Sequence, residues 1–370
     1  MKYWRKLLCF SILIYSSSAA YSQKPEEHQF QAAAKVGYGF IMNHSPSMEF
    51  ITNRHVSKVE LSLDGNNFGE KAWNERFKFP RVGISIAAYD FNNPTHIGKA
   101  IGVTPHFNFA LLGKNNIQWR MRTGIGLGYV QKPFDALDNF KNIAIGSKLN
   151  IYFSLVSEVE IRLFEHLGVL LGASFSHFSN SSYQKPNLGI NIPAVDAGIY
   201  YRFGDKKVRD FTAEPDFEIS RAFWKLAFGF GWNEVNPQAD KKHLAYGLSI
   251  AREKKVSNKR SIGGSADFFY NPVQRLVLQA DSIYINKGFE NLQYGLSFHH
   301  VLHFGKLETF VQAGYYLQTE DQEIGNFYQL VGGRYNIGKR FNALLAIKTH
   351  FAKAEYLTFG LGYKIGKDHE

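Results

Sequence analysis

Short stretches in which large apolar residues alternate with glycine or polar residues recur along the whole chain. From Thr123 the sequence reads TGIGLGYV, which places Ile125, Leu127 and Tyr129 on one face of an extended strand and glycines on the other. The segment 357–365 alternates in the same way. A period of two residues predicts β-strands, and no segment has the roughly 18 consecutive apolar residues that are typical of a membrane-spanning helix.

The direction in which the large side chains point distinguishes two all-β architectures. A soluble β-sandwich would point its large side chains inward, and glycine would have little reason to line the opposite, solvated face so regularly. In a narrow membrane barrel the large side chains face lipid, whereas small or polar side chains fill the interior. The alternation therefore predicts an all-β transmembrane antiparallel β-barrel, and a secreted β-sandwich is the alternative.

The alternation marks about eight strands in each half of the chain. The predicted strands of the first half are residues 31–42, 55–64, 81–91, 98–112, 117–131, 147–163, 166–179 and 191–203. Those of the second half are residues 222–233, 243–253, 261–270, 291–305, 307–318, 326–338, 340–351 and 355–366. Residues 205–221, between the two sets, are charged and include Pro215, as is typical of a linker between domains.

The two halves also resemble each other. His177–Tyr183 in the first half returns as His350–Tyr356 in the second, and two further matches keep the same order and spacing. We therefore expect an internal duplication with two tandem eight-stranded barrels, residues 23–204 and residues 222–370. One sixteen-stranded barrel is the alternative. An eight-stranded barrel fills its interior with side chains, which argues against a porin.

The first residues have the organisation of a secretory signal peptide, predicted as residues 1–22. Three cations precede an apolar stretch, residues 7–15, and small residues follow, so cleavage is predicted after Ser22. An N-terminal membrane anchor is the alternative, but the apolar stretch is too short to span a bilayer. Cys9, the only cysteine, lies within the predicted signal peptide, so we expect no disulfide in the exported chain.

Composition and charge exclude some classes of protein and leave others open. With 45% hydrophobic and 15% aromatic residues, the chain is too apolar to be disordered. A net charge of +11 suggests an anionic partner without distinguishing nucleic acid, a phosphorylated lipid surface and an acidic substrate. The sequence has no phosphate loop, dinucleotide fingerprint, zinc motif or nucleic-acid-binding module, so we expect no cofactor, no metal and no nucleic-acid partner.

Two groups of polar residues in the second half have simpler interpretations than a functional site. His299, His300 and His303 have no carboxylate at a fitting spacing, so we interpret them as histidines at a strand end rather than as metal ligands. The basic stretch 252–260 lies in a predicted turn. It is either a solvated loop, which we favour, or a contact for lipid phosphates.

A histidine and a serine stand out at the end of the predicted strand 166–179. His177 and Ser179 continue the row of Leu171 and Phe175, the face predicted to meet lipid, where polar side chains are costly. Residues at i and i+2 project from the same face of a strand, near enough for the imidazole to take the proton of the hydroxyl. That pairing supplies the nucleophile and base of acyl transfer. The alternative is an interfacial histidine and serine at a strand end.

The longer string around these two residues resembles a known family. His177-Phe178-Ser179-Asn180, followed by Lys185-Pro186-Asn187-Leu188-Gly189-Ile190, is similar to the motif of the PagL-type lipid A deacylases, which are outer-membrane barrel esterases. The resemblance implies a serine esterase that removes the 3-O-linked acyl chain from lipid A of lipopolysaccharide. It also implies a place in the outer membrane and an active site that opens onto the lipid face.

The same resemblance assigns roles to five residues. Ser179 would be the nucleophile and His177 the general base. Backbone N–H groups near Asn180 would stabilise the oxyanion, and Asn187 would support the site. The acidic residue of the family falls at the position of Asn191 in this sequence. An asparagine orients an imidazole through its side-chain oxygen, but it does not supply the charge that stabilises an imidazolium.

Asn191 therefore either replaces the acidic residue of the family or leaves that role to another carboxylate. Its parity matches the lipid-facing row of the predicted strand 191–203, so its side chain could reach the site. Asp196 has the opposite parity and is predicted to point into the barrel. Glu158 and Glu160, on the predicted strand 147–163, are further candidates.

The second half lacks the predicted catalytic residues. Its His350 is retained, but Ala352 and Lys353 stand at the positions of the nucleophile and of the following asparagine. We therefore expect a non-catalytic second barrel. For the whole protein, the alternative function is a non-catalytic barrel that binds lipid or supports the envelope, and the sequence leaves the oligomeric state open.

Overall fold

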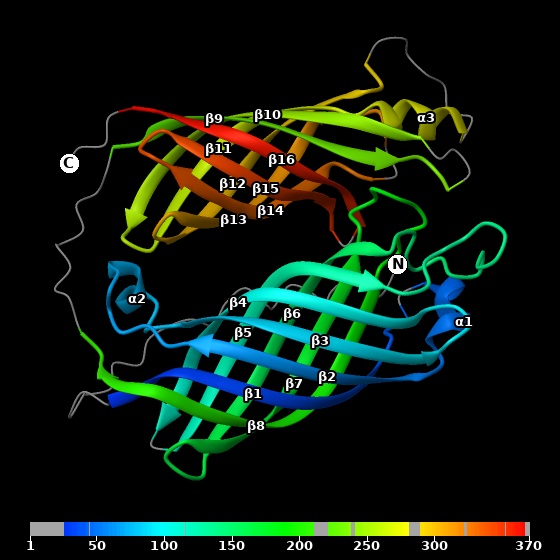
Figure 1. The fold of residues 1–370 in the computed structure, drawn as a ribbon. Helices are drawn as coiled ribbons and strands as arrows, with labels where there is room; N and C mark the ends of the chain where they lie inside the picture. The colour runs from blue at the N-terminus through cyan, green and yellow to red at the C-terminus, as the bar shows by residue number, and fades with distance from the viewer. Residues whose placement is uncertain are drawn as a thin grey trace, which may run out of the picture.

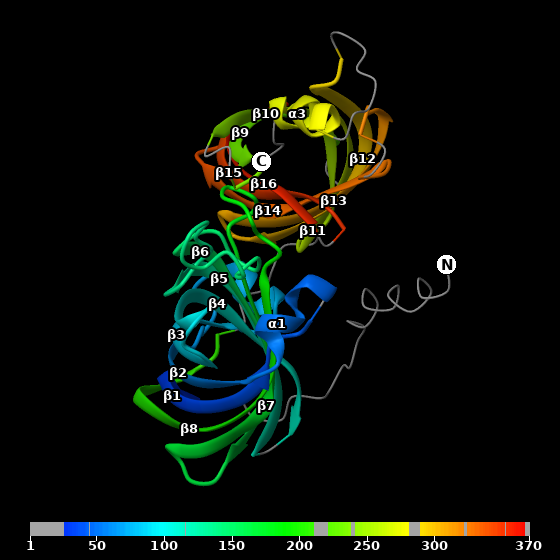
Figure 2. The same cartoon turned by 90° about the vertical axis from the view of Figure 1, so that its right-hand side faces the viewer.

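Two closed β-barrels lie side by side in the computed structural model (Figure 1). The structure describes residues 26–366 except 44, 115, 211–220, 238–240, 281–288, 322–323 and 352, so the predicted signal peptide lies outside the described residues. Each barrel consists of eight antiparallel strands in chain order, and its last strand pairs with its first. The two barrels are separate rings in Figure 2, so the prediction of two eight-stranded barrels is confirmed and the sixteen-stranded alternative is wrong.

The first barrel contains strands β1 to β8. They are β1 (Glu26–Phe40), β2 (His55–Gly65), β3 (Arg81–Asn93), β4 (Gly98–Lys114), β5 (Ile117–Val130), β6 (Leu149–Arg162), β7 (Leu167–Ser179) and β8 (Ile190–Val208). A 3-10 turn η1 (Pro46–Met48) and helix α1 (Glu49–Thr52) follow β1, and helix α2 (Ala72–Arg76) follows β2. The sequence does not predict these helices, because each is too short to show a helical period.

The second barrel contains strands β9 to β16. They are β9 (Phe223–Glu234), β10 (Lys242–Ser257), β11 (Arg260–Tyr270), β12 (Leu292–Phe304), β13 (Leu307–Gln318), β14 (Phe327–Ile337), β15 (Phe341–His350) and β16 (Lys353–Ile365). Helix α3 (Pro272–Ala280) follows β11. No helix in the described part of the chain is long and apolar enough to cross a membrane.

β8 and β10 are both longer than predicted where they carry charged residues. β8 continues to Val208, beyond the predicted end at residue 203, and its last residues pair with Glu26 and Glu27 at the start of β1. β10 continues to Ser257, so the basic stretch 252–260 is mostly strand, and its turn is confined to residues 258–259. In both places charged residues interrupt the apolar alternation, although the backbone pairing continues.

Large apolar side chains cover the outside of both barrels, as the alternation predicts. Leu127 and Val195 of the first barrel are 62% and 66% exposed, and Leu361 of the second barrel is 62% exposed. Ser174 and Ser176, which have the opposite parity on β7, are buried inside the first barrel. An apolar outer surface around a polar interior is the arrangement of a membrane barrel, and the closed barrels exclude the β-sandwich alternative.

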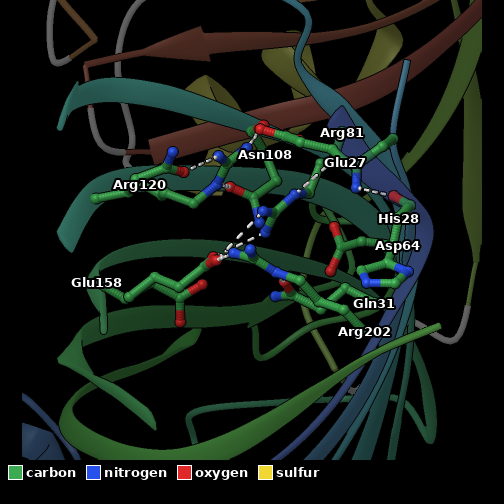
Figure 3. A network of polar contacts seen from close by, with 12 residues as sticks. Glu27, His28, Gln31, Asp64, Arg81, Asn108, Arg120, Glu158 and Arg202 are labelled. Carbon is green, nitrogen blue, oxygen red and sulfur yellow. Dashed lines mark hydrogen bonds and ion pairs between the residues drawn. The ribbon is translucent and has the colours of Figure 1, made fainter. Parts of the chain in front are cut away.

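Paired charges fill much of the interior of the first barrel, part of which is shown in Figure 3. Lys35 Nζ lies 3.0 Å from Glu60 and 2.9 Å from Glu158, and Arg81 lies 2.8 Å from Glu160. A buried charge costs several kcal/mol unless an opposite charge and hydrogen bonds compensate it. In these pairs each buried charge is compensated by an opposite charge from another strand.

The interior pairs also decide between the carboxylates considered for the site. Glu158 and Glu160 point into the barrel, so the interpretation of either as a partner of His177 is wrong. Asp196 lies 2.7 Å from Lys58 inside the barrel, and its predicted inward direction is confirmed.

The two barrels contact each other at both ends. At the end that carries α2, the ring of Phe304 on β12 stacks on Phe77 with centroids 4.3 Å apart and lies 5.0 Å from Phe107. Arg76 donates a hydrogen bond to the backbone carbonyl of Asn258 at 2.9 Å. At the opposite end, the contact is made by the β7–β8 loop (residues 180–189), which belongs to the candidate site.

Candidate active site

The last three residues of β7 alternate between the outside and the interior of the first barrel. Phe178 is fully buried, and its ring centroid lies 4.8 Å from that of Tyr152 and 5.5 Å from that of Tyr89. His177 and Ser179, on either side of Phe178, therefore share the outer face of the strand. The buried ring fixes the strand end and with it the direction of both polar side chains.

Asn191 lies directly opposite His177 on the neighbouring strand β8. Its side-chain oxygen is 2.6 Å from His177 Nδ1. Because an amide oxygen only accepts hydrogen bonds, Nδ1 carries the proton, and Nε2 of the neutral ring has the lone pair that a general base needs. The structure thus brings Asn191 together with His177 through the register of two adjacent strands.

Ser179 is 8% exposed, and its hydroxyl oxygen accepts two hydrogen bonds from the β7–β8 loop. The backbone N–H of Ser181 donates at 3.2 Å and Asn187 Nδ2 donates at 3.0 Å. The side-chain oxygen of Asn187 in turn accepts a hydrogen bond from the backbone N–H of Asn180 at 3.0 Å. Asn187 therefore connects the strand end to the loop, and two N–H donors meet at Ser179 Oγ.

Asn180 lies at the start of the β7–β8 loop and is held by hydrogen bonds within it. Its backbone N–H, expected near the oxyanion, is bonded to Asn187. Its side-chain Nδ2 donates to Ser147 Oγ at 2.8 Å and to the carbonyl of Gln184 at 2.7 Å. Asn180 thus shapes the loop, while Asn187 and the backbone N–H of Ser181, the residue after Asn180, supply the donors at the serine.

Gly189 lets the β7–β8 loop pass close to the imidazole. Its φ is +85°, a left-handed conformation that favours glycine, and a Cβ at this position would lie 2.6 Å from His177 Cε1. Ser181 and Ser182 also have left-handed backbones, with φ of 53° and 62°. Sequence patterns reveal neither conformation, because both depend on the path of the whole loop.

The second barrel holds the same loop from the other side. Lys185 N–H donates to Glu234 Oε2 at 2.6 Å, and Lys185 Nζ donates to the carbonyl of Val235 at 3.1 Å. Glu234 N–H donates to the carbonyl of Ser182 at 3.1 Å, and the Ser182 hydroxyl donates to the carbonyl of Ala354 at 2.9 Å. The loop is therefore fixed between the two barrels.

In the second barrel, His350 has a different environment from His177. It is buried in the barrel interior, where its Nε2 lies 2.9 Å from the hydroxyl of Tyr316. The interpretation of His350 as a retained counterpart of His177 is therefore wrong, because the two imidazoles face opposite sides of their strands. Ala352 lies outside the described residues, and Lys353 is exposed.

The histidines of β12 lie close to carboxylates that sequence spacing does not reveal. His299 Nε2 is 3.2 Å from Glu253, and His303 Nδ1 is 3.3 Å from Glu308. These pairs join different strands of the second barrel. Within the described residues, neither histidine belongs to a group of three side chains close enough to share a metal ion.

Comparison with known families covers both barrels. Residues 57–205 match the family described as lipid A 3-O-deacylase (PagL). Residues 222–367 match the family described as acyloxyacyl hydrolase, C-terminal domain. No curated protein matches the chain.

Several solved structures are similar to the chain at low sequence identity. Neisserial surface protein A is 10% identical with a TM-score of 0.35, and the match covers 47% of this chain and 97% of that one. A deletion mutant of the monoaromatic hydrocarbon channel TodX is 8% identical with a TM-score of 0.18, covering 93% and 91%. The outer membrane protein Omp33 of Acinetobacter baumannii is 10% identical with a TM-score of 0.18, covering 93% and 100%. Because these identities and TM-scores are low, the function is inferred from the family matches alone.

Proposed function

Since the chain belongs to the lipid A 3-O-deacylase (PagL) family of outer-membrane carboxylic ester hydrolases, we propose that Ser179 and His177 carry out its reaction. The substrate is lipid A of lipopolysaccharide, and the bond cleaved is the ester of the 3-O-linked acyl chain. The observation that carries the proposal is the 2.6 Å hydrogen bond between His177 Nδ1 and Asn191. It leaves Nε2 as the base on the same face as the serine hydroxyl.

In the first half of the reaction, Ser179 Oγ attacks the carbonyl carbon of the ester while His177 Nε2 takes the hydroxyl proton. The carbonyl oxygen becomes an oxyanion. We assign its stabilisation to the N–H donors of Ser181 and Asn187, which converge on Ser179. As the bond to the sugar breaks, the imidazolium gives its proton to the 3-oxygen of the sugar, and the acyl group remains on the serine.

In the second half, a water molecule attacks the acyl-serine ester. His177 takes a proton from this water and then returns it to Ser179 Oγ, which releases the fatty acid and restores the resting site. Asn191 keeps the imidazole in the required tautomer through both halves. Its neutral amide does not stabilise the imidazolium with a full charge.

The direction of the site suits a lipid substrate. His177 and Ser179 lie on the same face of β7 as Leu171, which is 52% exposed on the apolar outer surface. An acyl chain in the bilayer therefore reaches the serine from the outside of the barrel, without crossing the packed interior. This geometry supports an acyl ester of a membrane lipid as the substrate.

The first test is the substitution Ser179→Ala. We expect the barrel to fold and the release of the 3-O-linked acyl chain to fall by at least about a thousandfold, because the nucleophile is lost. The measurement is mass spectrometry of lipid A after incubation with the purified, folded protein. Ser176→Ala is the matched control, since Ser176 lies on the same strand but faces the interior.

The control separates loss of chemistry from loss of fold. We expect Ser176→Ala to deacylate lipid A at a rate close to that of the unmodified protein. Undiminished deacylation by Ser179→Ala would reject the proposed nucleophile. Intact lipid A after incubation with the unmodified protein would instead favour the non-catalytic, lipid-binding alternative.

A further inference from the structure

Three side chains with metal-binding groups meet at the end of the first barrel opposite the candidate active site. They are His28 on β1 and Glu165 and His166 in the turn between β6 and β7, and one ligand atom of each lies within 4.8 Å of the other two. The described residues contain one such group of three. The length of β7 separates this turn from Ser179 by about 40 Å at ~3.3 Å per residue.

Both imidazoles are held in the tautomer that leaves Nε2 for a metal. His28 Nδ1 lies 3.0 Å from the carbonyl of Gly204, and His166 Nδ1 lies 2.9 Å from the carbonyl of Arg202. A carbonyl only accepts hydrogen bonds, so each Nδ1 carries the proton and each neutral ring has its lone pair on Nε2. A backbone carbonyl on the far nitrogen is the usual way in which a protein orients a metal-binding histidine.

The Nε2 of His28 has no hydrogen-bond partner although the side chain is buried, with 7% exposure. A buried nitrogen with an unused lone pair is unfavourable unless a ligand completes it. The ring of His166 lies beside that of His28, with centroids 4.5 Å apart and a tilt of 41°. The two rings are therefore neighbours, and one nitrogen of each lies within 4.8 Å of the other.

We propose that His28, His166 and Glu165 bind one divalent transition-metal ion, for which zinc is the best-suited probe. Two imidazoles and one carboxylate are ligands that zinc accepts in a tetrahedral site, and water would fill the fourth position. The ion would connect β1 to the β6–β7 turn next to the pairing of β1 with β8. That pairing closes the barrel, and its register shifts between His28 and Phe30. The site thus stabilises the seam of the barrel and takes no part in the chemistry at Ser179.

One neighbour competes with the metal. Lys206 forms an ion pair with the carboxylate of Glu165. A lysine ammonium has no lone pair and repels a divalent cation. Lys206 therefore weakens the site in two ways: it occupies the carboxylate of Glu165, and its positive charge opposes that of the metal ion. Removing this charge should therefore increase the affinity for zinc, whereas removing a ligand should decrease it.

The test is calorimetric titration of zinc chloride into the full-length mature protein, folded in detergent and freed of metal with a chelator. We expect one zinc ion per chain. His28→Gln and His166→Gln should each lower the affinity at least about tenfold, and Lys206→Met should raise it severalfold. His55→Gln is the control for adventitious binding, because His55 is exposed and distant in the fold, and it should leave the affinity unchanged.

A second readout is independent of calorimetry. Zinc should raise the unfolding temperature of the unmodified protein, followed by heat-dependent gel mobility, and should not raise that of the His166→Gln protein. If His28→Gln fails to fold, Glu165→Gln replaces it as the variant that lacks one ligand, because Glu165 lies in an exposed turn. The proposal is overturned if the unmodified protein does not bind zinc, if both histidine variants bind it normally, or if His55→Gln weakens binding as much as they do.

Discussion

At the level of single residues, the group that orients the histidine is the most consequential feature of the candidate site. Asn191 binds His177 Nδ1 with a neutral amide oxygen, where the family pattern expects an acid. Glu158 and Glu160 cannot take over this role, because they point into the barrel interior and pair with Lys35 and Arg81. The orientation of His177 should therefore depend on Asn191 itself.

Substitutions at Asn191 test this dependence. Asn191→Ala should slow deacylation about fivefold or more, and Asn191→Glu should preserve or increase the rate by up to about the same factor. A charge-assisted hydrogen bond exceeds a neutral one by about 1 kcal/mol in such a transition state, which corresponds to that factor. Initial rates of both variants on one lipid A preparation provide the measurement. Turnover of Asn191→Ala at the original rate would remove Asn191 from the proposed mechanism.

The sequence predicts the strand residues of the site and, from the loop, Asn187 and the backbone amides near Asn180, but it does not predict the conformation of the loop. The parity of an alternating strand places His177 and Ser179 on one face, and strand register then brings Asn191 opposite the histidine. The amide of Ser181 reaches Ser179, and Gly189 passes the imidazole, only because of left-handed backbone conformations in the β7–β8 loop. Such conformations arise from the path of the loop and leave no periodic signal.

At the level of secondary structure elements, the strands are predictable because each must satisfy two environments. One face meets lipid and the other meets the interior, so the residue type changes at every position. The signal fades at the ends of β8 and β10, where both faces carry polar residues, and it is absent from the short helices. The pairing of interior charges is also hidden, since the partners come from strands far apart in the sequence.

We expect the interior charges to support the strands without serving the reaction, and Glu158 tests this expectation. Glu158→Gln removes the charge next to Lys35 Nζ, which keeps its contact with Glu60 at 3.0 Å. We expect a loss of stability of about 2 kcal/mol and unchanged turnover by the folded protein. Urea unfolding and the deacylation rate per folded molecule measure the two effects. A loss of turnover at full stability would place Glu158 in the site after all.

At the level of the whole molecule, the second barrel contributes to the site through a loop of the first. Glu234 and Val235, next to the end of β9, bind Lys185 in the β7–β8 loop, and Asn187 in the same loop binds Ser179. No pattern along the chain indicates this contact, because its two sides belong to separately closed barrels. The non-catalytic role expected for the second half thus includes support of the loop that carries Asn187.

A pair of substitutions at Glu234 measures the value of this support. Glu234→Ala removes the acceptor of Lys185 N–H and should slow turnover about tenfold, equivalent to about 1.4 kcal/mol, because the loop is less firmly positioned. Glu234→Gln keeps an acceptor oxygen and should restore most of the rate. Arg76→Ala is the control, since it removes a contact between the barrels at the opposite end. Equal rates for Glu234→Ala and the unmodified protein would show that the loop needs no support.

The contact between the β7–β8 loop and Glu234 has a consequence for how activity depends on the amount of protein. Both sides of the contact belong to one polypeptide, so its formation is unimolecular and requires no encounter in the plane of the membrane. A support supplied by a separate protein would be lost as the two components became sparse. Here each molecule carries its own support, so turnover per molecule should stay constant on dilution into excess lipid, and total deacylation should increase in direct proportion to copy number.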